Sequence, residues 1–538
     1  MSDYTMSESK YTLKTSVGDF TGAELRNSVT GEPQTYLYSQ IPYAESFSGE
    51  NRWEKPVQLP SDHDYTGDYS SFGFQAPQPK IDNKELEYIS PDVPSSEDIN
   101  YVNIWVPSGT PPPGGYPVFI YIHGGWLQYG DPNKFENPRE LHGSHGLMKY
   151  IIVNPGYRLN VLGFFASTEL QKLNPGNTNL GFWDQRAAIE WVYQNITYFG
   201  GNPEKITVGG LSAGSYSTFF QLAYELYNPK VSQIIKQVVH FSNALLVQPK
   251  AIKEVDEQYE ELLTLLDIPL SLTPEEKLSH LRNVSADKLM EVLPTMKQHT
   301  FRAVSDNIFI ANTLLSDLKS GKFSKLLLQK KNFNIVIGEV ANEPYLYSVL
   351  DTPTSQEELI VQLENYYPTA AVKEMIKLYP TVPNSLPEVE YHEQLRQLFG
   401  TIVADGQVYA SSRGYVKNLV NNGFPKERIF RYKVSYRPKY LDQLLDPYHG
   451  VIHGMDQKVW FLGIGATEEE KRLIETFIFP FNEILGFADP KKINWGTLTE
   501  KQYRSISPTG ETSVIKDDDW QWGTSVAETV ITAQLHSS

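Results

Sequence analysis

The sequence predicts an α/β protein in which a central mixed, mostly parallel sheet is flanked by helices, with a small N-terminal antiparallel sheet and helical insertions. Two short apolar runs, residues 118–122 and 206–208, have the length of buried strands and end in glycine-rich segments. Helical spacing over residues 216–226 follows the second run closely. A strand that turns into a helix is typical of parallel sheets.

The composition describes an ordinary globular protein with ample core. Of 538 residues, 40% are hydrophobic and 21% are charged. The net charge of −17 disfavours nucleic acids and anionic membrane surfaces as partners, because both are negatively charged. We expect one large domain over residues 1–538 that acts on a small molecule, and the sequence does not indicate its oligomeric state.

The chain contains no cysteine, which excludes disulfides, thiolate nucleophiles and cysteine metal sites together. This composition suits a reducing compartment. Residues 1–20 contain no apolar segment of signal-peptide length, and no run of about 18 apolar residues follows. We therefore expect a cytoplasmic protein without a membrane span; a secreted protein whose signal has been removed would look the same.

Several segments can be assigned in chain order. Residues 11–43 alternate strand-like runs with turns, which predicts an antiparallel edge beside the main sheet. Residues 70–96 are rich in proline, serine and aromatics and predict a long surface loop near the site. A helix is predicted over 187–198, and residues 250–300 are mostly helical. This last segment can form a cap over a substrate pocket, or can equally consist of extra packing helices.

Residues 210–214 read GLSAG and match the pattern G-x-S-x-G. In a strand-to-helix turn this pattern holds the serine in a strained backbone conformation with its hydroxyl exposed, so the flanking residues must be small. Gly210, Ala213 and Gly214 meet that requirement. We therefore interpret Ser212 as a nucleophile; the alternative is a chance match of a short motif.

A second glycine-rich segment, residues 123–126 (HGGW), follows the apolar run 118–122. Acyl transfer places negative charge on a carbonyl oxygen, and each backbone N–H group directed at that oxygen lowers the barrier by about 3–4 kcal/mol. Glycines let the backbone approach the oxygen closely. We expect the backbone N–H groups of Gly125, Trp126 and Ala213 to form this oxyanion hole; the alternative is a simple turn after a strand.

His142 and His145 are three residues apart, a spacing that can suit a metal ion. No carboxylate cluster accompanies them, so we interpret both as solvated helix surface. We expect neither a metal nor an organic cofactor.

Activation of a serine requires a base that takes its proton and a carboxylate that orients the base. In one common α/β arrangement the order along the chain is serine, acid, histidine. The apolar strand predicted at 334–337 is followed by Glu339 and Glu343. Catalytic groups in such sheets gather at the carboxyl ends of strands, so both glutamates are candidates for the acid.

The base must be sought among the histidines that follow Ser212. Seven of the eleven histidines do so, and two of them, His449 and His453, each precede a glycine after the predicted strand 429–435. Their position near the end of the chain fits the expected order for both.

Several segments resemble the type-B carboxylesterases and cholinesterases. Residues 199–214, FGGNPEKITVGGLSAG, fit every specified position of the serine signature F-G-G-x4-[LIVM]-x-[LIV]-x-G-x-S-[STAG]-G. Residues 450–454, GVIHG, resemble the GxxHG base motif, and Glu343 lies five residues after Gly338 as in the G-x-x-x-x-E acid motif. Pro344 replaces the glycine that usually follows this acid. The likeness covers nearly the whole chain.

The resemblance implies an α/β-hydrolase fold and a serine carboxylesterase that needs no cofactor. By its motifs, Ser212 is the nucleophile and His453 the base. Glu343 is the acid, and Asp306 is its rival because it aligns with a different family landmark.

The resemblance also marks positions outside the reaction. Arg158 and Asp184 lie in segments that resemble the family, and we expect them to form a structural ion pair. Ile99 and Asn100 stand where the second family signature has Cys-Leu. The disulfide that staples the 70–96 loop in many relatives is therefore absent.

Two other functions fit the same fold. A lipase would be distinguished by interfacial activation on long-chain triglycerides, whereas a non-catalytic, cholinesterase-like binding protein usually lacks a member of the triad. Leu211 stands where cholinesterases carry a glutamate before the serine, so we expect no preference for choline esters. Trp126 takes the place of the third glycine of the family's oxyanion run, so we expect its indole to exclude bulky tertiary alcohols.

Overall fold

The structure is a computed structural model that describes residues 7–27, 30–81, 93–133, 142, 146–443, 445–462 and 465–537. Its strands are β1 (Ser7–Thr15), β2 (Gly18–Arg26), β3 (Pro33–Pro42), β4 (Gly67–Asp68), β5 (Tyr101–Pro107), β6 (Tyr116–Ile122), β7 (Ile151–Pro155), β8 (Gly201–Leu211), β9 (Ile235–Phe241), β10 (Asn334–Val340), β11 (Ile429–Val434), β12 (Gln502–Ile506) and β13 (Thr512–Lys516). Its helices are α2 (Asn160–Phe164), α3 (Thr168–Leu173), α4 (Leu180–Asn195), α5 (Ala213–Tyr227), α6 (Asp256–Leu265), α7 (Pro274–Arg282), α8 (Ala286–Val292), α9 (Leu314–Ser320), α10 (Lys322–Leu327), α11 (Pro344–Ser348), α12 (Gln356–Glu364), α13 (Thr369–Ile376), α14 (Glu388–Ala404), α15 (Ala410–Asn421), α16 (Gln457–Trp460), α17 (Glu468–Leu485) and α18 (Trp520–Ser537).

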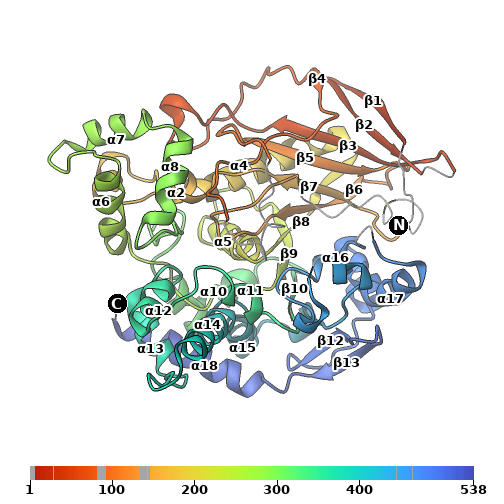
Figure 1. The fold of residues 1–538 in the computed structure, drawn as a ribbon. Coiled ribbons are helices and arrows are strands. Elements are labelled where there is room, and N and C mark those ends of the chain that lie inside the picture. The colour runs from red at the N-terminus through yellow and green to blue at the C-terminus, as the bar shows by residue number, and fades with distance from the viewer. Residues whose placement is uncertain are drawn as a thin grey trace.

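The strands form one mixed sheet in the order β1-β2-β3-β5-β7-β6-β8-β9-β10-β11-β12-β13, with β4 paired beside β2 (Figure 1). The strands from β7 to β12 pair in parallel, and both ends of the sheet are antiparallel. The predicted N-terminal antiparallel strands are present, and β3 joins them to the main sheet through β5. The predicted α/β architecture is therefore confirmed.

The centre of the sheet is buried on both faces, as strand β6 illustrates. Val118 and Ile120 belong to the core that contains residues of α4 and α5, whereas Phe119 and Tyr121 belong to the core that contains residues of α17. A strand covered by helices on both faces reads as a continuous apolar run. This is why residues 118–122 could be recognised as a strand.

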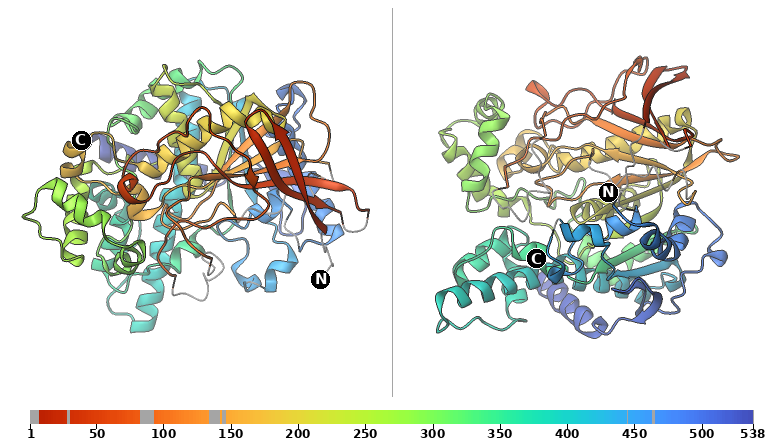
Figure 2. Two further views of the ribbon diagram at one scale, coloured as in Figure 1. Left: turned by 90° about the horizontal axis from the view of Figure 1, so that it is seen from above. Right: turned by 45° about the vertical axis from the view of Figure 1, so that its right-hand side comes forward.

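The segment between β9 and β10 contains the helical insertion. Helices α6, α7 and α8 lie together at one side of the molecule, away from β12 and β13 (Figures 1 and 2). Thr273 begins α7 with the predicted capping box, in which its hydroxyl accepts from the Glu276 N–H. Tyr259 and Leu281 are buried in the main core, so these helices pack on the body of the protein.

Helix α4 begins earlier than predicted. The sequence indicated residues 187–198, whereas the helix runs from Leu180 to Asn195. The first turn is stabilised by buried contacts that periodicity alone does not show, because Asp184 faces inward and forms the predicted ion pair with Arg158 at 2.7 Å. The structural role expected for this pair is confirmed.

Residues 82–92 of the predicted 70–96 loop lie outside the described residues, and the segment that follows the loop is held by side-chain contacts. Asn100 donates from its side-chain amide to the carbonyls of Ala44 and Glu45, and Arg52 forms an ion pair with Glu97. Hydrogen bonds and one ion pair therefore stabilise this segment in a chain without cysteine.

Candidate active site

Ser212 stands at the turn between β8 and α5, with φ 56° and ψ −119°. Such a conformation is costly for a non-glycine residue and is maintained by its surroundings. A Cβ at Gly214 would overlap the carbonyl oxygen of Ile122, and a Cβ at Gly210 would overlap the same oxygen. The glycines of the G-x-S-x-G pattern are therefore required by the packing of the turn against β6.

Glu343 and His453 meet at the carboxyl ends of β10 and β11. Asn342 pairs with Ile452 in an isolated β-bridge, so the residues that follow them come side by side. Nδ1 of His453 lies 2.5 Å from Oε2 of Glu343, and both side chains are almost fully buried. The carboxylate accepts the Nδ1 proton, which leaves Nε2 of His453 as a proton acceptor.

The second carboxylate oxygen of Glu343, Oε1, also has hydrogen-bond donors. Oε1 accepts from the Ser242 hydroxyl at 2.8 Å and from the Val340 backbone N–H at 2.8 Å. Ser242 follows β9, the neighbour of the nucleophile strand. The sequence offered no sign of this residue beyond its place at a strand end.

Tyr347 is a further residue of the site that sequence reasoning missed. Its hydroxyl lies 3.4 Å from Nε2 of His453. In the described part of the chain, Ser212 has no direct hydrogen bond to His453, and the tyrosine hydroxyl is the group in contact with Nε2. Burial, followed by the charge of Glu343, raises the pKa of Tyr347 well above its usual value, so the phenol is neutral. Its place one helical turn after Glu343 was the available signal.

The predicted oxyanion hole has three backbone N–H groups without acceptors among the described residues, those of Gly125, Trp126 and Ala213. Ala213 is the first residue of α5, where a backbone N–H has no partner within the helix. Trp126 and Leu127 have φ values of 60° and 67°, so the loop is strained next to the serine. A Cβ on Gly124 would lie 2.7 Å from the Leu211 carbonyl oxygen, which shows how closely the two segments approach.

The indole of Trp126 is buried and packs edge-on against two rings. Its centroid lies 6.3 Å from that of Tyr347 and 6.3 Å from that of Tyr129. Trp126 also lines a pocket together with Leu293 and Asp351. The indole therefore lies between the residues around Ser212 and this pocket.

The rival acids and the rival base have other partners. Glu339 is paired with Arg413 at 2.9 Å, and Asp306 accepts hydrogen bonds from three successive backbone N–H groups, those of residues 308–310. The His449 ring lies against Tyr345, with centroids 3.9 Å apart. Among the described residues, Glu343 is the carboxylate in contact with His453.

His142 is buried, so the expectation of a solvated helix surface is wrong for it; His145 lies outside the described residues. Nδ1 of His142 is 3.1 Å from the Thr35 hydroxyl, and its Nε2 is 3.1 Å from the Tyr150 carbonyl oxygen. Burial lowers the pKa of His142 to about 3, so the ring is neutral. The described residues contain no group of three or more histidine, cysteine or acidic side chains that could hold a metal ion.

A second buried carboxyl lies near the triad. Asp456 accepts from the Tyr432 hydroxyl at 2.8 Å, and burial raises its pKa to about 6. The charge of Glu343 adds to this rise, while that of His453 opposes it.

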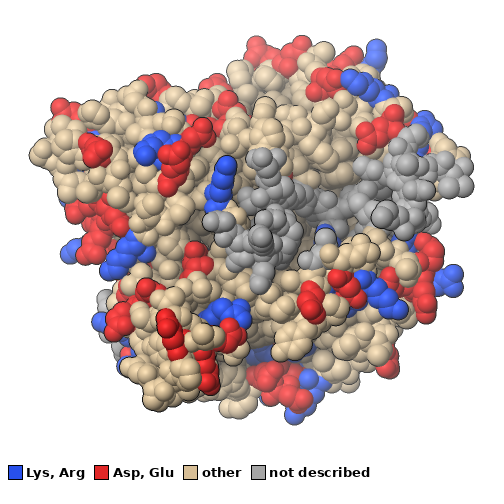
Figure 3. Space-filling view, in the orientation of Figure 1, with Lys and Arg blue, Asp and Glu red and all other residues tan. Residues whose placement is uncertain are grey.

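The surface face in Figure 3 carries acidic and basic side chains interspersed with one another. Among the helices that the structure describes, none has both the length and the apolar character needed to cross a membrane.

Comparison with known proteins places the chain among ester hydrolases. A model of the Carboxylesterase family matches residues 9–519. An uncharacterized esterase/lipase of Schizosaccharomyces pombe is 40% identical over 504 residues, which cover 93% of each chain. A carboxylic ester hydrolase of Gibberella moniliformis is 35% identical over 515 residues, which cover 92% of this chain and 91% of that one.

A solved structure supports the fold. The crystal structure of Aspergillus niger EstA aligns with a TM-score of 0.75 at 18% identity and covers 98% of this chain and 99% of its own. At that identity the likeness concerns the fold alone.

Proposed function

This chain belongs to the carboxylesterase family and is a carboxylic ester hydrolase, and from that premise we propose that it acts through an acyl-enzyme with Ser212, His453 and Glu343 as its triad. The single observation that carries the proposal is the 2.5 Å contact between His453 and Glu343, at the same end of the sheet as Ser212.

The first half-reaction forms the acyl-enzyme. The Ser212 hydroxyl turns toward Nε2 of His453, gives up its proton and attacks the ester carbonyl. Glu343 stabilises the imidazolium that forms. The N–H groups of Gly125, Trp126 and Ala213 donate to the oxyanion of the tetrahedral intermediate. Collapse of the intermediate expels the alkoxide, which takes the proton from His453.

The second half-reaction releases the acid. Water gives a proton to Nε2 of His453 and attacks the acyl carbonyl, and the same N–H groups stabilise the second intermediate. Ser212 leaves with the proton, so the products are the alcohol and the carboxylic acid. Tyr347 contacts His453, and its neutral hydroxyl donates to Nε2 between turnovers.

The test compares Ser212→Ala with Ser217→Ala, a serine on the same helix whose hydroxyl donates to the Ala213 carbonyl. Ser212→Ala should lose at least three decades of kcat on p-nitrophenyl butyrate, because the nucleophile is removed, while Ser217→Ala should retain activity. An organophosphate should label wild type once per chain at Ser212. Labelling at another residue, or activity in Ser212→Ala, would refute the mechanism.

The same assay distinguishes the alternatives. Interfacial activation on long-chain triglycerides would identify a lipase, and absence of both labelling and hydrolysis would identify a binding protein.

A further inference from the structure

The pocket lined by Trp126 adjoins the place where the proposed reaction releases its alcohol. The departing alkoxide takes its proton from Nε2 of His453, so the alcohol leaves beside this nitrogen. The Tyr347 hydroxyl lies 3.4 Å from Nε2, and the Tyr347 ring packs edge-on against the indole of Trp126. Tyr129 belongs to the same loop as Trp126, since its backbone N–H donates to the carbonyl of Gly125 at 2.8 Å. The wall of this pocket therefore begins at the oxyanion loop.

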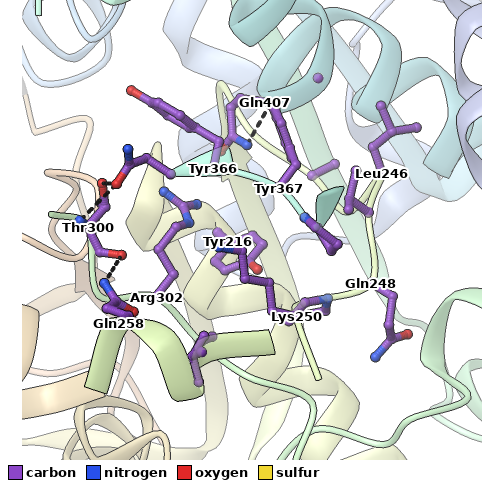
Figure 4. A pocket seen from close by; sticks show the side chains of 18 residues that line it. Tyr216, Leu246, Gln248, Lys250, Gln258, Thr300, Arg302, Tyr366, Tyr367 and Gln407 are labelled. Atoms are coloured by element: carbon purple, nitrogen blue, oxygen red, sulfur yellow. Dashed lines mark hydrogen bonds between the residues drawn. The ribbon is translucent and has the colours of Figure 1, made fainter. Parts of the chain in front are cut away.

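This cavity, which we call the Trp126 pocket, has a volume of about 380 Å³ and is large enough for the alcohol part of an ester. Three parts of the chain form its wall: the oxyanion loop with Tyr129, the end of the helical insertion with Thr300, and the segment after α11 with Asp351. Thr300 and Tyr366 also line a second cavity of about 30 Å³, which has room only for water (Figure 4). Of these two cavities, the Trp126 pocket is the one that can hold an alcohol.

The carboxylate of Asp351 is an acceptor without a donor in this pocket. Its side chain is 42% exposed, and among the described residues it accepts no hydrogen bond. Its closest cation is Nε2 of His299 at 4.0 Å, and that nitrogen lies 3.2 Å from Oε1 of Gln362. An ionised carboxylate can accept several hydrogen bonds. Asp351 can therefore receive O–H groups of a bound molecule.

Two tyrosine hydroxyls on the same wall have a proton to donate. The Tyr129 hydroxyl makes no hydrogen bond within the described ranges, and Asp351 acts on it electrostatically. The Tyr366 hydroxyl is beside the indole N–H of Trp126, which can only donate, so the tyrosine keeps its own proton available. Burial, followed by the charge of Asp351, raises the pKa of both phenols, so both are neutral donors.

The charges on this wall favour a neutral ligand. Lys80 lines the pocket together with Asp351, so a cation meets an ammonium there and an anion meets a carboxylate. A hydroxyl group avoids both penalties, because it donates to a carboxylate and accepts from a phenol. The rings of Trp126, Tyr129 and Tyr366 add apolar surface for the carbon atoms that carry such hydroxyls.

We propose that the Trp126 pocket binds the alcohol part of the substrate and selects an alcohol with further hydroxyl groups, such as glycerol or a sugar, over an alkyl alcohol of equal length. The inference rests on the proposed function at Ser212. The further hydroxyls donate to Asp351 and accept from Tyr129 and Tyr366. An alkyl alcohol leaves these three groups without partners, and a site built to bind a hydroxyl rejects the analogue that lacks it.

The test compares two butyrate esters that differ only in hydroxyl groups, 2,3-dihydroxypropyl butyrate and propyl butyrate. The readout is the ratio of their kcat/KM values, in which a general loss of activity cancels. Wild type should favour the dihydroxypropyl ester about tenfold or more, because its hydroxyls bind a charged group. Asp351→Asn should lower the ratio about fivefold, and Tyr129→Phe, which removes a neutral donor, about threefold.

Each variant has a matched control elsewhere on the protein. Asp287→Asn removes an exposed carboxylate of α8, and Tyr193→Phe removes a hydroxyl on α4 that lies 3.4 Å from Glu204. Both controls should keep the wild-type ratio. Asparagine suits the position of Asp351, whose φ is 50°, because it tolerates a left-handed conformation. The Asp351→Asn variant should therefore fold.

A second measurement needs only the wild type. The acyl-enzyme formed from p-nitrophenyl butyrate can pass its acyl group to an alcohol in place of water. The alcohol then gives its proton to His453, forms the new ester and releases Ser212, which recovers that proton. In equal concentrations of glycerol and 1-propanol, the glycerol ester should exceed the propyl ester after correction for the two primary hydroxyls of glycerol.

The outcomes separate the pocket from the reaction. The inference would be overturned by the absence of a wild-type preference for the dihydroxypropyl ester, by an unchanged ratio in both pocket variants, or by an excess of propyl ester in the transfer experiment. A wild-type preference for butyrylcholine over both esters would overturn it in favour of a cation site. Absence of hydrolysis of every ester would contradict the proposed function itself.

Discussion

Glu339 and Glu343 are four residues apart, and exchanging each for glutamine should damage different properties of the enzyme. Glu343→Gln should lower kcat about 10³–10⁴-fold, because an amide cannot stabilise the imidazolium of His453 or hold its tautomer. Glu343 also accepts from Ser242 and from the Val340 N–H. Glutamine can still accept through its oxygen, so the fold should be retained.

Glu339→Gln should lower the free energy of unfolding. The Glu339 carboxylate lies 2.9 Å and 3.1 Å from the two terminal nitrogens of Arg413 and 3.4 Å from the Lys433 ammonium. Removing one partner of a buried ion pair costs about 3–5 kcal/mol. We expect the lower end, near 3 kcal/mol, because Arg413 keeps Asp517 at 2.8 Å and Lys433 can reach solvent.

The assay measures kcat per organophosphate-titrated site at 20–25 °C, together with the midpoint of urea unfolding by near-UV circular dichroism. Glu343→Gln should lose kcat with the midpoint near that of wild type. Glu339→Gln should keep kcat within a few-fold while its midpoint falls. If the folded Glu339→Gln were the inactive variant, the assignment of the acid would be wrong.

Four further predictions follow from single residues. Trp126→Gly should raise hydrolysis of tert-butyl acetate relative to ethyl acetate at least tenfold, because the indole packs against Tyr347 of the site and we expect it to limit the space for the alcohol; equal wild-type rates on the two esters would contradict this. Because Leu211 offers no carboxylate, kcat/KM for butyrylcholine should not exceed that for a matched neutral butyrate. Burial lowers the pKa of His142 to about 3, so protons bind the unfolded chain preferentially below pH 6.5. The unfolding free energy should therefore fall by about 2 kcal/mol between pH 6.5 and 5 on account of this residue, and His142→Gln should lack that part of the slope. Burial raises the pKa of Asp456 to about 6, so its folded form binds a proton more tightly; Asp456→Asn should stabilise the protein by about 2–3 kcal/mol at pH 7.5, a gain that disappears as pH falls through 6 toward 4.

The nucleophile turn could be predicted from sequence because its cause is local. A strained serine next to β6 requires glycine where any Cβ would meet the Ile122 carbonyl, and the pattern records that requirement at Gly210 and Gly214. The central strands could also be predicted, because strands buried on both faces have continuous apolar runs without polar alternation.

The acid and the base could not be paired from local signals. Glu343 and His453 are 110 residues apart, and the bridge between Asn342 and Ile452 that aligns them depends on the whole sheet. Periodicity left Glu339 and Glu343 equivalent, and family resemblance chose between them. Tyr347 and the burial of His142 were missed for the same reason, since each depends on distant segments. The cytoplasmic setting stays a prediction.

The pocket that Trp126 lines contains an acidic and a basic side chain, Asp351 and Lys80. Because charges of both signs line it, selection of the alcohol there should depend on its size, which the indole limits, more than on its charge.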